Sequence, residues 1–216
     1  MVGKHQKKIV SKLLRLGVGI AGATEFIYKV AEQLLARNTP QSDPLCLLPL
    51  DFSNAFNRLN RFEMRREVRC RAPEISPWVE YPYAVSAQLI VDHNNNLLSK
   101  GGVQQGAPLA PLLFSIGADP LVKLVSAIPG IIWSPWYLDD GSIVAPVSVI
   151  PDALNAVTTH GPAYGLHLNL GKCSITGHGI SQALLQRYGV PNVPIHSWLK
   201  VKVPVSWATP WEPRIL

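Results

Sequence analysis

Three aspartates occupy positions where carboxylates could do chemistry. Asp139 and Asp140 are adjacent in the stretch WYLDDGSIV (136–144), between two apolar runs, and Asp51 directly follows the apolar stretch LCLLPL (45–50). Asp-Asp-Gly is compatible with an ordinary hairpin turn, because aspartate and glycine suit tight turns with positive φ. It is equally compatible with a metal site, because gathered carboxylates repel one another unless a divalent cation neutralises them.

The metal interpretation leads to a specific reaction. If Asp51 ends one strand while Asp139 and Asp140 lie at the tip of a neighbouring hairpin, the three side chains meet at one edge of a sheet. Magnesium prefers a few carboxylates together with substrate phosphates. Two such ions about 4 Å apart lower the pKa of an attacking hydroxyl and stabilise a leaving pyrophosphate, which is nucleotidyl transfer. On this stretch alone, the turn and the metal site both remain open.

The composition is that of a packed globular protein. The chain has 216 residues, 47% of them hydrophobic, enough for one sizeable core or two small lobes that share one. No apolar run approaches the roughly 20 residues of a membrane span, and the N-terminus lacks the apolar core of a secretory signal. Three cysteines without metal-ligand spacing predict free thiols in a reducing compartment and no zinc site.

The net charge of +6 comes from two groups of basic residues. Basic groups beside an acidic cluster suit an enzyme that handles a polyanion, although solvated helix faces give the same pattern. The first group is Lys4, Lys7, Lys8, Lys12 and Arg15, and the second is Arg58, Arg61, Arg65, Arg66, Arg69 and Arg71.

Helices and hairpins alternate irregularly along the chain, which predicts an α+β fold with an antiparallel sheet and helices packed on one face. A strand is expected to deliver Asp51, although Pro49 suits a sheet only where no neighbouring strand needs its N–H. Thr24 is the expected N-cap of the second helix. Helices are predicted over 7–15, 24–36, 61–70, 75–83, 151–165 and 181–189 and after Pro111, hairpins over 87–102 and 136–145, and strands within 166–176 and 198–205.

Four segments resemble, in order and spacing, the palm of reverse transcriptases, and are most similar to the enzymes of non-LTR retrotransposons and group II introns. They are LDFSNAF (50–56), GGVQQGAPLAPLLF (101–114), YLDDG (137–141) and GLHLNLGKC (165–173). LGVGIAGATEFIYKV (16–30) and WLKVKVPV (198–205) resemble flanking segments of some eukaryotic retroelement polymerases. The resemblance implies a polymerase palm that acts as a retroelement RNA-directed DNA polymerase in nucleus or cytoplasm. Its partners would be an RNA template, a DNA primer and deoxynucleotides, with no membrane.

The resemblance also implies roles for individual residues. Asp51 and Asp139 would bind two Mg²⁺ (or Mn²⁺) ions, with Asp140 in support and the backbone carbonyl of Phe52 as a further ligand. Phe56 matches the position under the incoming sugar, where a ring excludes a 2′-hydroxyl and disfavours an RNA-copying RNA polymerase. A core aromatic is the alternative for Phe56.

Further positions would contact the substrates. Gln105 and Gly106 would lie against the nascent base pair and the template. Lys172 would approach the triphosphate and protonate the leaving pyrophosphate, or else be a surface lysine. Lys200 and Lys202 would lie near the primer backbone.

The sequence also departs from the family pattern. Ala107 and Ala110 stand where small polar residues are more frequent, and Pro49 lies two residues before Asp51. We expect residues 1–40 to be a helical remnant of the fingers side, and 41–216 to be a palm with the thumb largely absent. Fingers, thumb or endonuclease segments would then belong to another part of the element. Two functions stay open: an active polymerase, or a truncated, non-catalytic palm that only binds nucleic acid.

Overall fold

A three-stranded antiparallel sheet lies at the centre of the protein, in the order β1 (Leu45–Leu50), β5 (Asp140–Pro146) and β4 (Trp136–Tyr137). The computed structural model describes residues 22–36, 42–90, 96–191 and 193–196. The helix predicted over 7–15, the strand predicted over 198–205, and with it Lys200 and Lys202, lie outside the described residues.

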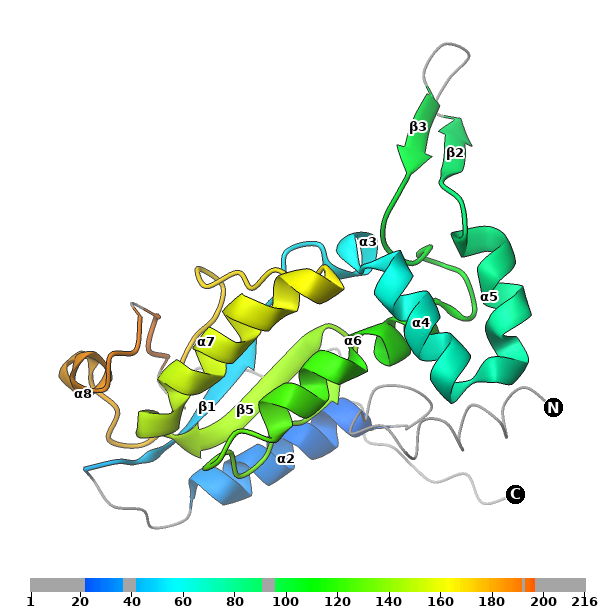
Figure 1. Cartoon of the computed structure of the whole chain (residues 1–216). Coiled ribbons are helices and arrows are strands. Elements are labelled where there is room, and N and C mark those ends of the chain that lie inside the picture. Colours follow the sequence, from blue (N-terminus) through cyan, green and yellow to red (C-terminus); the bar gives the residue numbers. More distant parts are fainter. Residues whose placement is uncertain (1–21, 37–41, 91–95, 192, 197–216) are drawn as a thin grey trace, which may run out of the picture.

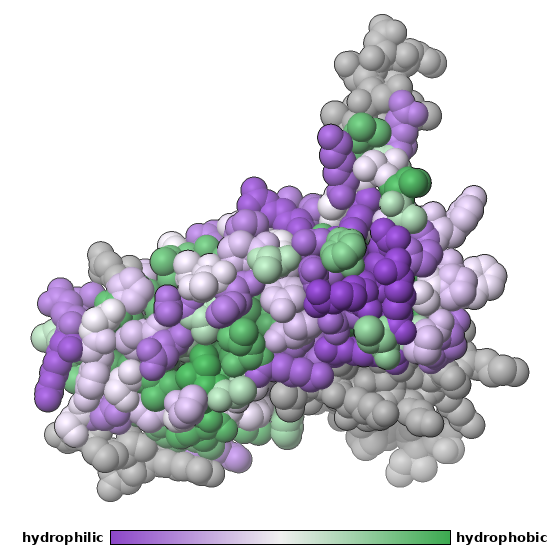
Figure 2. Space-filling model, in the orientation of Figure 1, coloured by the Kyte–Doolittle hydropathy of each residue, from purple (hydrophilic) through white to green (hydrophobic). Residues whose placement is uncertain are grey.

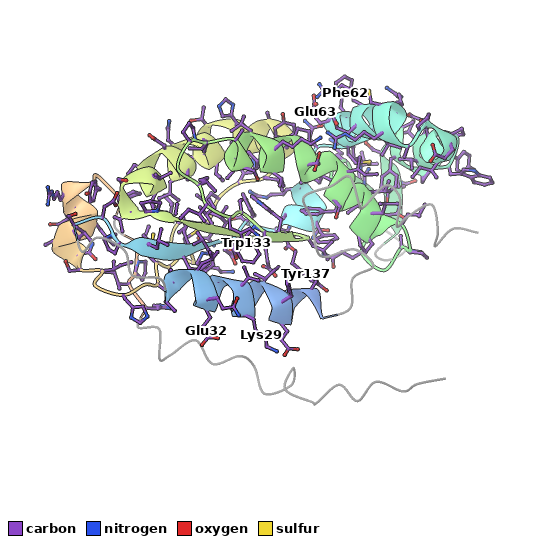
Figure 3. The ribbon with its side chains drawn as sticks, turned by 90° about the horizontal axis from the view of Figure 1, so that it is seen from below. Lys29, Glu32, Phe62, Glu63, Trp133 and Tyr137 are labelled. Atoms are coloured by element: carbon purple, nitrogen blue, oxygen red, sulfur yellow. The ribbon has the colours of Figure 1, made fainter. Side chains whose placement is uncertain are left out.

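Strand β1 is apolar at nearly every position because both faces of the sheet are covered. Its side chains alternate between the two sides. Cys46, Leu48 and Leu50 belong to the main core, whereas Leu45 and Leu47 pack into a second cluster with α2. The sheet is therefore the middle layer of three (Figures 1 and 3).

Helices α6 (Ala110–Ser126) and α7 (Ile150–His160) cover one face of the sheet, as predicted, and α2 (Ala23–Leu35) covers the opposite face (Figure 1). On that second face Trp133 packs against the α2 cluster, while Lys29 and Glu32 point away from the sheet (Figure 3). The predicted α+β class is confirmed, with helices on both sides of the sheet.

Helix α6 is the central helix of the main core. Twelve of its 17 residues are buried. Pro111 lies in its first turn, as predicted, where the backbone N–H that proline lacks would have no partner within the helix. At Gly117 a Cβ would lie 2.9 Å from the Met64 side chain, so glycine lets α4 (Arg61–Arg71) approach closely.

A helical lobe with a projecting hairpin follows β1. It contains α3 (Ala55–Arg58), which the sequence did not indicate, then α4, a 3₁₀ turn (Pro73–Ile75) and α5 (Ser76–Tyr83). Asn60 caps α4, because its side-chain oxygen accepts from the Phe62 and Glu63 amides. The predicted hairpin, β2 (Ala87–Ile90) and β3 (Asn96–Ser99), stands out from the body (Figure 1).

The second basic group is largely neutralised inside this lobe, so it does not form the free polyanion-binding face that the sequence allowed. Strongly hydrophilic residues gather over α4, below the projecting hairpin (Figure 2). Within the described residues, however, most of the α4 arginines have acidic partners. The ion pairs are Arg65 and Arg69 with Glu80, Arg66 with Glu63 and Glu67, and Arg71 with Glu67 and Asp119.

Two local predictions were wrong. Helix α2 begins at Ala23 after Gly22, whose φ of 70° stops the helix without a side-chain cap, so Thr24 is not the N-cap. Residues 166–176 form isolated bridges rather than a strand.

The remaining elements flank or follow α7. A 3₁₀ turn (Val147–Val149) precedes α7, and a second 3₁₀ turn (Gly161–Tyr164) and α8 (Gln182–Arg187) follow it. Among the described helices, none has the length and apolarity to cross a membrane.

Candidate active site

The hairpin that carries the two adjacent aspartates turns two residues earlier than Asp-Gly chemistry suggests. Tyr137 pairs with Asp140, so the turn consists of Leu138 and Asp139, and Asp140 is the first residue of β5. Leu138 has a φ of 54°, a conformation that is strained for a side chain of this size. The glycine is needed elsewhere: a Cβ on Gly141 would lie 2.8 Å from the ring of Trp136.

Strand pairing brings Asp51 to this hairpin. Leu50 pairs with Gly141 in the antiparallel ladder, so Asp51 and Asp140 follow at the next opposed position, where side chains share one face. Burial raises the pKa of Asp140 above its ordinary value, and the carboxylates of Asp139 and Asp51 raise it further. The structure thus places Asp51 and Asp139 each within electrostatic reach of Asp140.

Residues 167–176 run along the other edge of β1. The Ser53 amide donates to the carbonyl of His167 (2.9 Å), the Asn169 amide donates to the carbonyl of Asp51 (2.8 Å), and Leu47 pairs with Thr176. Pro49 falls between these contacts on the same edge, where its missing N–H leaves the ladder interrupted. The awkward proline is tolerated because the neighbouring chain turns away at that point.

The turn that holds Lys172 lies at that interruption. From one bridge, Leu47 with Thr176, to the next, Phe52 with Leu168, β1 advances five residues and its neighbour eight. The extra residues bulge outward, and Lys172 Nζ comes within 3.9 Å of Asp51 Oδ1. The lysine side chain remains 69% exposed, so this is a loose surface contact.

Cys173 is a neighbour of the site that the sequence did not single out. It is buried, and its thiol donates to the carbonyl of Asn169 at 3.4 Å. Burial raises the pKa of this thiol, and the nearby charge of Asp51 adds to the shift against an opposing backbone hydrogen bond at Asp51. Its place next to Lys172 in the motif GLHLNLGKC was the available signal.

A pocket of about 420 Å³ joins the other predicted residues. The ring of Phe56 stacks on Phe114 with centroids 4.4 Å apart and planes 10° from parallel. Gln105 and Gly106, both exposed, approach from the loop before α6. The lining residues are Phe56, Gln105, Gly106, Ala107, Pro108, Ala110 and Pro111.

Phe52 differs from the others because its side chain belongs to the core. Its ring is buried and stacks on Trp136, with centroids 5.8 Å apart. This stack packs Phe52, the residue after Asp51, against β4, the strand that leads into the turn with Asp139. Only the backbone of Phe52 is therefore available to a ligand.

The aspartates have the chemistry that a divalent cation requires. Asp51 Oδ1 is a buried oxygen without a hydrogen-bond partner, and three carboxyl groups repel one another beside it. A cation would relieve both penalties, so the residues fit such an ion. In the part of the chain that the structure describes, no three His, Cys, Asp or Glu side chains already stand close enough to form a complete metal site.

Comparison with known proteins identifies a family for this chain. Residues 4–203 match the family described as reverse transcriptase (RNA-dependent DNA polymerase), whose members generally use divalent metal ions. No curated protein sequence matches the chain.

The fold is similar to that of telomerases. The apo telomerase of Candida tropicalis superposes with a TM-score of 0.61 at 11% identity, over 82% of this chain and 36% of that one. The telomerase of Candida albicans in complex with a TWJ fragment of telomeric RNA gives 0.53 at 16% identity, over 84% and 34%. The chain spans about a third of the length of these telomerases, and at such identities the likeness concerns the fold alone. Since the family match covers most of the sequence, the chain belongs to the reverse transcriptase family of RNA-dependent DNA polymerases.

Proposed function

We propose that this chain is the palm of a retroelement RNA-directed DNA polymerase of the non-LTR or group II intron type. It extends the 3′ end of a DNA primer with deoxynucleotides on an RNA template. The observation that carries the proposal is that Asp51 and Asp139 both lie close enough to Asp140 to raise its pKa, next to the paired residues Leu50 and Gly141. Like charges crowded at the end of a sheet, in a chain of this family, suit metal-dependent nucleotidyl transfer.

Two metal ions would be held by Asp51, Asp139 and the Phe52 carbonyl, with Asp140 in support. When bound, two Mg²⁺ or Mn²⁺ ions would activate the primer hydroxyl and neutralise charge on the pyrophosphate. The chain itself holds the carboxylates at the adjoining ends of two paired strands, so their spacing is set before substrate arrives. The positive φ of Leu138 supports this function, because local strain is commonly retained where it aims a functional group.

The pocket lined by Phe56, Gln105 and Gly106 would receive the nucleotide. The ring of Phe56, held by Phe114, would lie under the sugar and exclude a 2′-hydroxyl, while Gln105 and Gly106 would contact the base pair and template. The primer 3′ oxygen forms a bond to the α-phosphorus as the bond to pyrophosphate breaks. Lys172, whose Nζ is 3.9 Å from Asp51 Oδ1 and whose side chain is mostly exposed, would donate a proton to the departing oxygen.

The alternative function is a truncated palm that binds nucleic acid without catalysis. It is favoured by one observation: within the described residues, no three His, Cys, Asp or Glu side chains stand close enough to hold a metal ion. In both functions residues 1–40 would belong to the fingers side and 41–216 to the palm.

Primer extension distinguishes the two functions. The wild-type chain is incubated with an RNA template, a DNA primer, deoxynucleotides and Mg²⁺ or Mn²⁺, alongside Asp139→Ala, Asp140→Ala and Asp152→Ala. Asp152 is an exposed aspartate in the first turn of α7 and serves as the matched control. The polymerase proposal expects extension by wild type and Asp152→Ala, and its loss in the other two variants with primer–template affinity unchanged. Binding without extension by the wild type would instead support the non-catalytic palm.

A further inference from the structure

Arg61 differs from the other arginines of α4 in what it contacts. Its side chain is directed at the end of the β2–β3 hairpin: Nε donates to the carbonyl of Gly102 at 2.7 Å, and Nη2 donates to Ser99 Oγ at 2.7 Å. Nη1 donates to the backbone carbonyl of Ser99. Only 8% of Arg61 is exposed, and within the described chain none of these contacts is a carboxylate.

Burial without a counter-charge is costly for a guanidinium. It lowers the pKa of Arg61, and the ring of Tyr83, 5.3 Å from the guanidinium carbon, opposes that shift. A position that only needed to be filled would be better served by an apolar side chain. What an apolar side chain lacks is a planar fork that holds two residues of one loop in fixed orientation.

The loop that Arg61 holds is attached to the body by hydrogen bonds at three consecutive residues before the pocket. The Gly102 amide donates to the carbonyl of Leu59 (2.8 Å), and the Val103 amide donates to that of Phe56 (2.8 Å). The Gln104 amide donates to the Tyr83 hydroxyl, at 3.1 Å.

Position 102 requires glycine, because the backbone there passes close to Phe56. Its φ is 71°, and a Cβ there would lie 2.3 Å from the carbonyl oxygen of Phe56. The next residues along the loop are Gln105 and Gly106, which line the pocket opposite Phe56. Arg61 and Tyr83 therefore fix the last attached residues before the two that would contact the nucleotide.

We infer that Arg61 is a positioning residue that sets the gap between the Phe56 ring and the Gln105–Gly106 loop, and so determines affinity for the incoming deoxynucleotide. This inference rests on the proposed function of the pocket. Arg61 does not touch the substrate; it acts through the carbonyls of Ser99 and Gly102. Because Ser99 ends β3, the same contact ties the hairpin, which projects from the body (Figure 1), to the loop that leads to the pocket.

The test compares Arg61→Lys with Arg71→Lys. Both variants keep the charge and remove the fork of an arginine on α4, but Arg71 binds Glu67 and Asp119 rather than the loop. We expect Arg61→Lys to raise the KM for deoxynucleotides about tenfold while kcat changes by less than about threefold. Arg71→Lys should leave KM at the wild-type value. An unchanged KM in Arg61→Lys, or an equal rise in both variants, overturns the inference.

Hydrogen exchange provides a readout that does not depend on turnover. In Arg61→Lys the amides of Gly102, Val103 and Gln104 should exchange faster than in wild type, whereas Arg71→Lys should leave them protected. Unchanged protection in Arg61→Lys overturns the positioning contact. If the wild-type chain neither extends primers nor binds deoxynucleotides in calorimetry, the proposed function is contradicted instead. The exchange data then still decide whether Arg61 holds the loop.

Discussion

Phe114, fully buried in α6, lies flat against the ring of Phe56, with centroids 4.4 Å apart. The stack fixes one face of Phe56 inside the core and leaves the ring at the edge of the pocket. A core aromatic and a sugar gate are therefore not exclusive alternatives for Phe56. The packing that makes it part of the core is also what would make it a rigid obstacle to a 2′-hydroxyl.

Replacing Phe56 by alanine is expected to admit ribonucleotides. Removing the ring opens space under the sugar, so the preference for deoxynucleotides in kcat/KM should fall at least about tenfold. The measurement is single-nucleotide incorporation with matched deoxy- and ribonucleotides. Phe62→Ala is the control, since Phe62 is 65% exposed and does not line the pocket. No gain in ribonucleotide use would remove the gate from the proposal.

Gly165→Ala is expected to destabilise the fold severely. Gly165 has a φ of 77°, and a Cβ there would lie 1.9 Å from the Arg58 carbonyl oxygen, which belongs to backbone and cannot rotate away. We expect a loss of about 3 kcal/mol or more in the free energy of unfolding, measured by urea denaturation.

Gly179→Ala is the matched control for that substitution. Gly179 has nearly the same φ, 73°, but no atom lies within 4 Å of the position that an alanine Cβ would take there. The backbone cost alone should be about 1–2 kcal/mol. Equal losses in the two variants would show that the contact with Arg58 carries no stability.

The linear order of the sequence was enough to predict the main secondary-structure elements and to single out the three aspartates as candidates. Asp51 follows a run of apolar residues, and Asp139 with Asp140 interrupts another, so two strands ending in acid groups could be predicted without coordinates. Pro111 likewise located the start of α6. These signals are local, and local propensity agrees here with the final fold.

What could not be predicted depends on tertiary contacts. The run LCLL (45–48) gives no indication of which helix covers which face, so the packing of α2 became visible only in the structure. The burial of Arg61 is hidden for the same reason, because nothing in the pattern separates it from the ion-paired arginines that follow it. The bulge at Lys172 lies beside Pro49, which is more than a hundred residues earlier in the chain, so the sequence order does not reveal it.

The three cysteines are expected to react with a thiol reagent in two distinct phases. Cys70 is exposed, whereas Cys46 and Cys173 are buried with raised pKa values, to about 12 for Cys46. Near pH 8 the reagent should therefore modify one thiol of the native chain rapidly, and the other two only at the rate of unfolding. A second rapid thiol would show that Cys46 or Cys173 is accessible in the folded chain.

Cys46 should also make the free energy of unfolding depend on pH in the alkaline range. Burial and Asp43 raise its pKa in the folded chain from 9.0 to about 12, so the folded state holds the proton that the unfolded state loses. Its contribution to stability is complete below about pH 9 and declines as the pH rises toward 12. The free energy of unfolding should fall more steeply with pH in wild type than in Cys46→Ala. Parallel slopes between about pH 9 and pH 11 would contradict this expectation.

Substitution of Lys172 should separate stability from catalysis. The side chain is 69% exposed and its contact with Asp51 is 3.9 Å long, so Lys172→Ala should change the free energy of unfolding by less than about 0.5 kcal/mol. If Lys172 protonates the leaving pyrophosphate, the same variant should lose about a hundredfold in the rate of nucleotide addition. Lys172→Arg keeps the charge but hardly releases a proton, so it should remain slow, whereas a purely electrostatic role would be restored by arginine. Single-turnover rates for wild type and both variants decide between these roles, with Lys123→Ala, a lysine that pairs with Asp119 on α6, as the control. A surface lysine without function would leave all the rates equal.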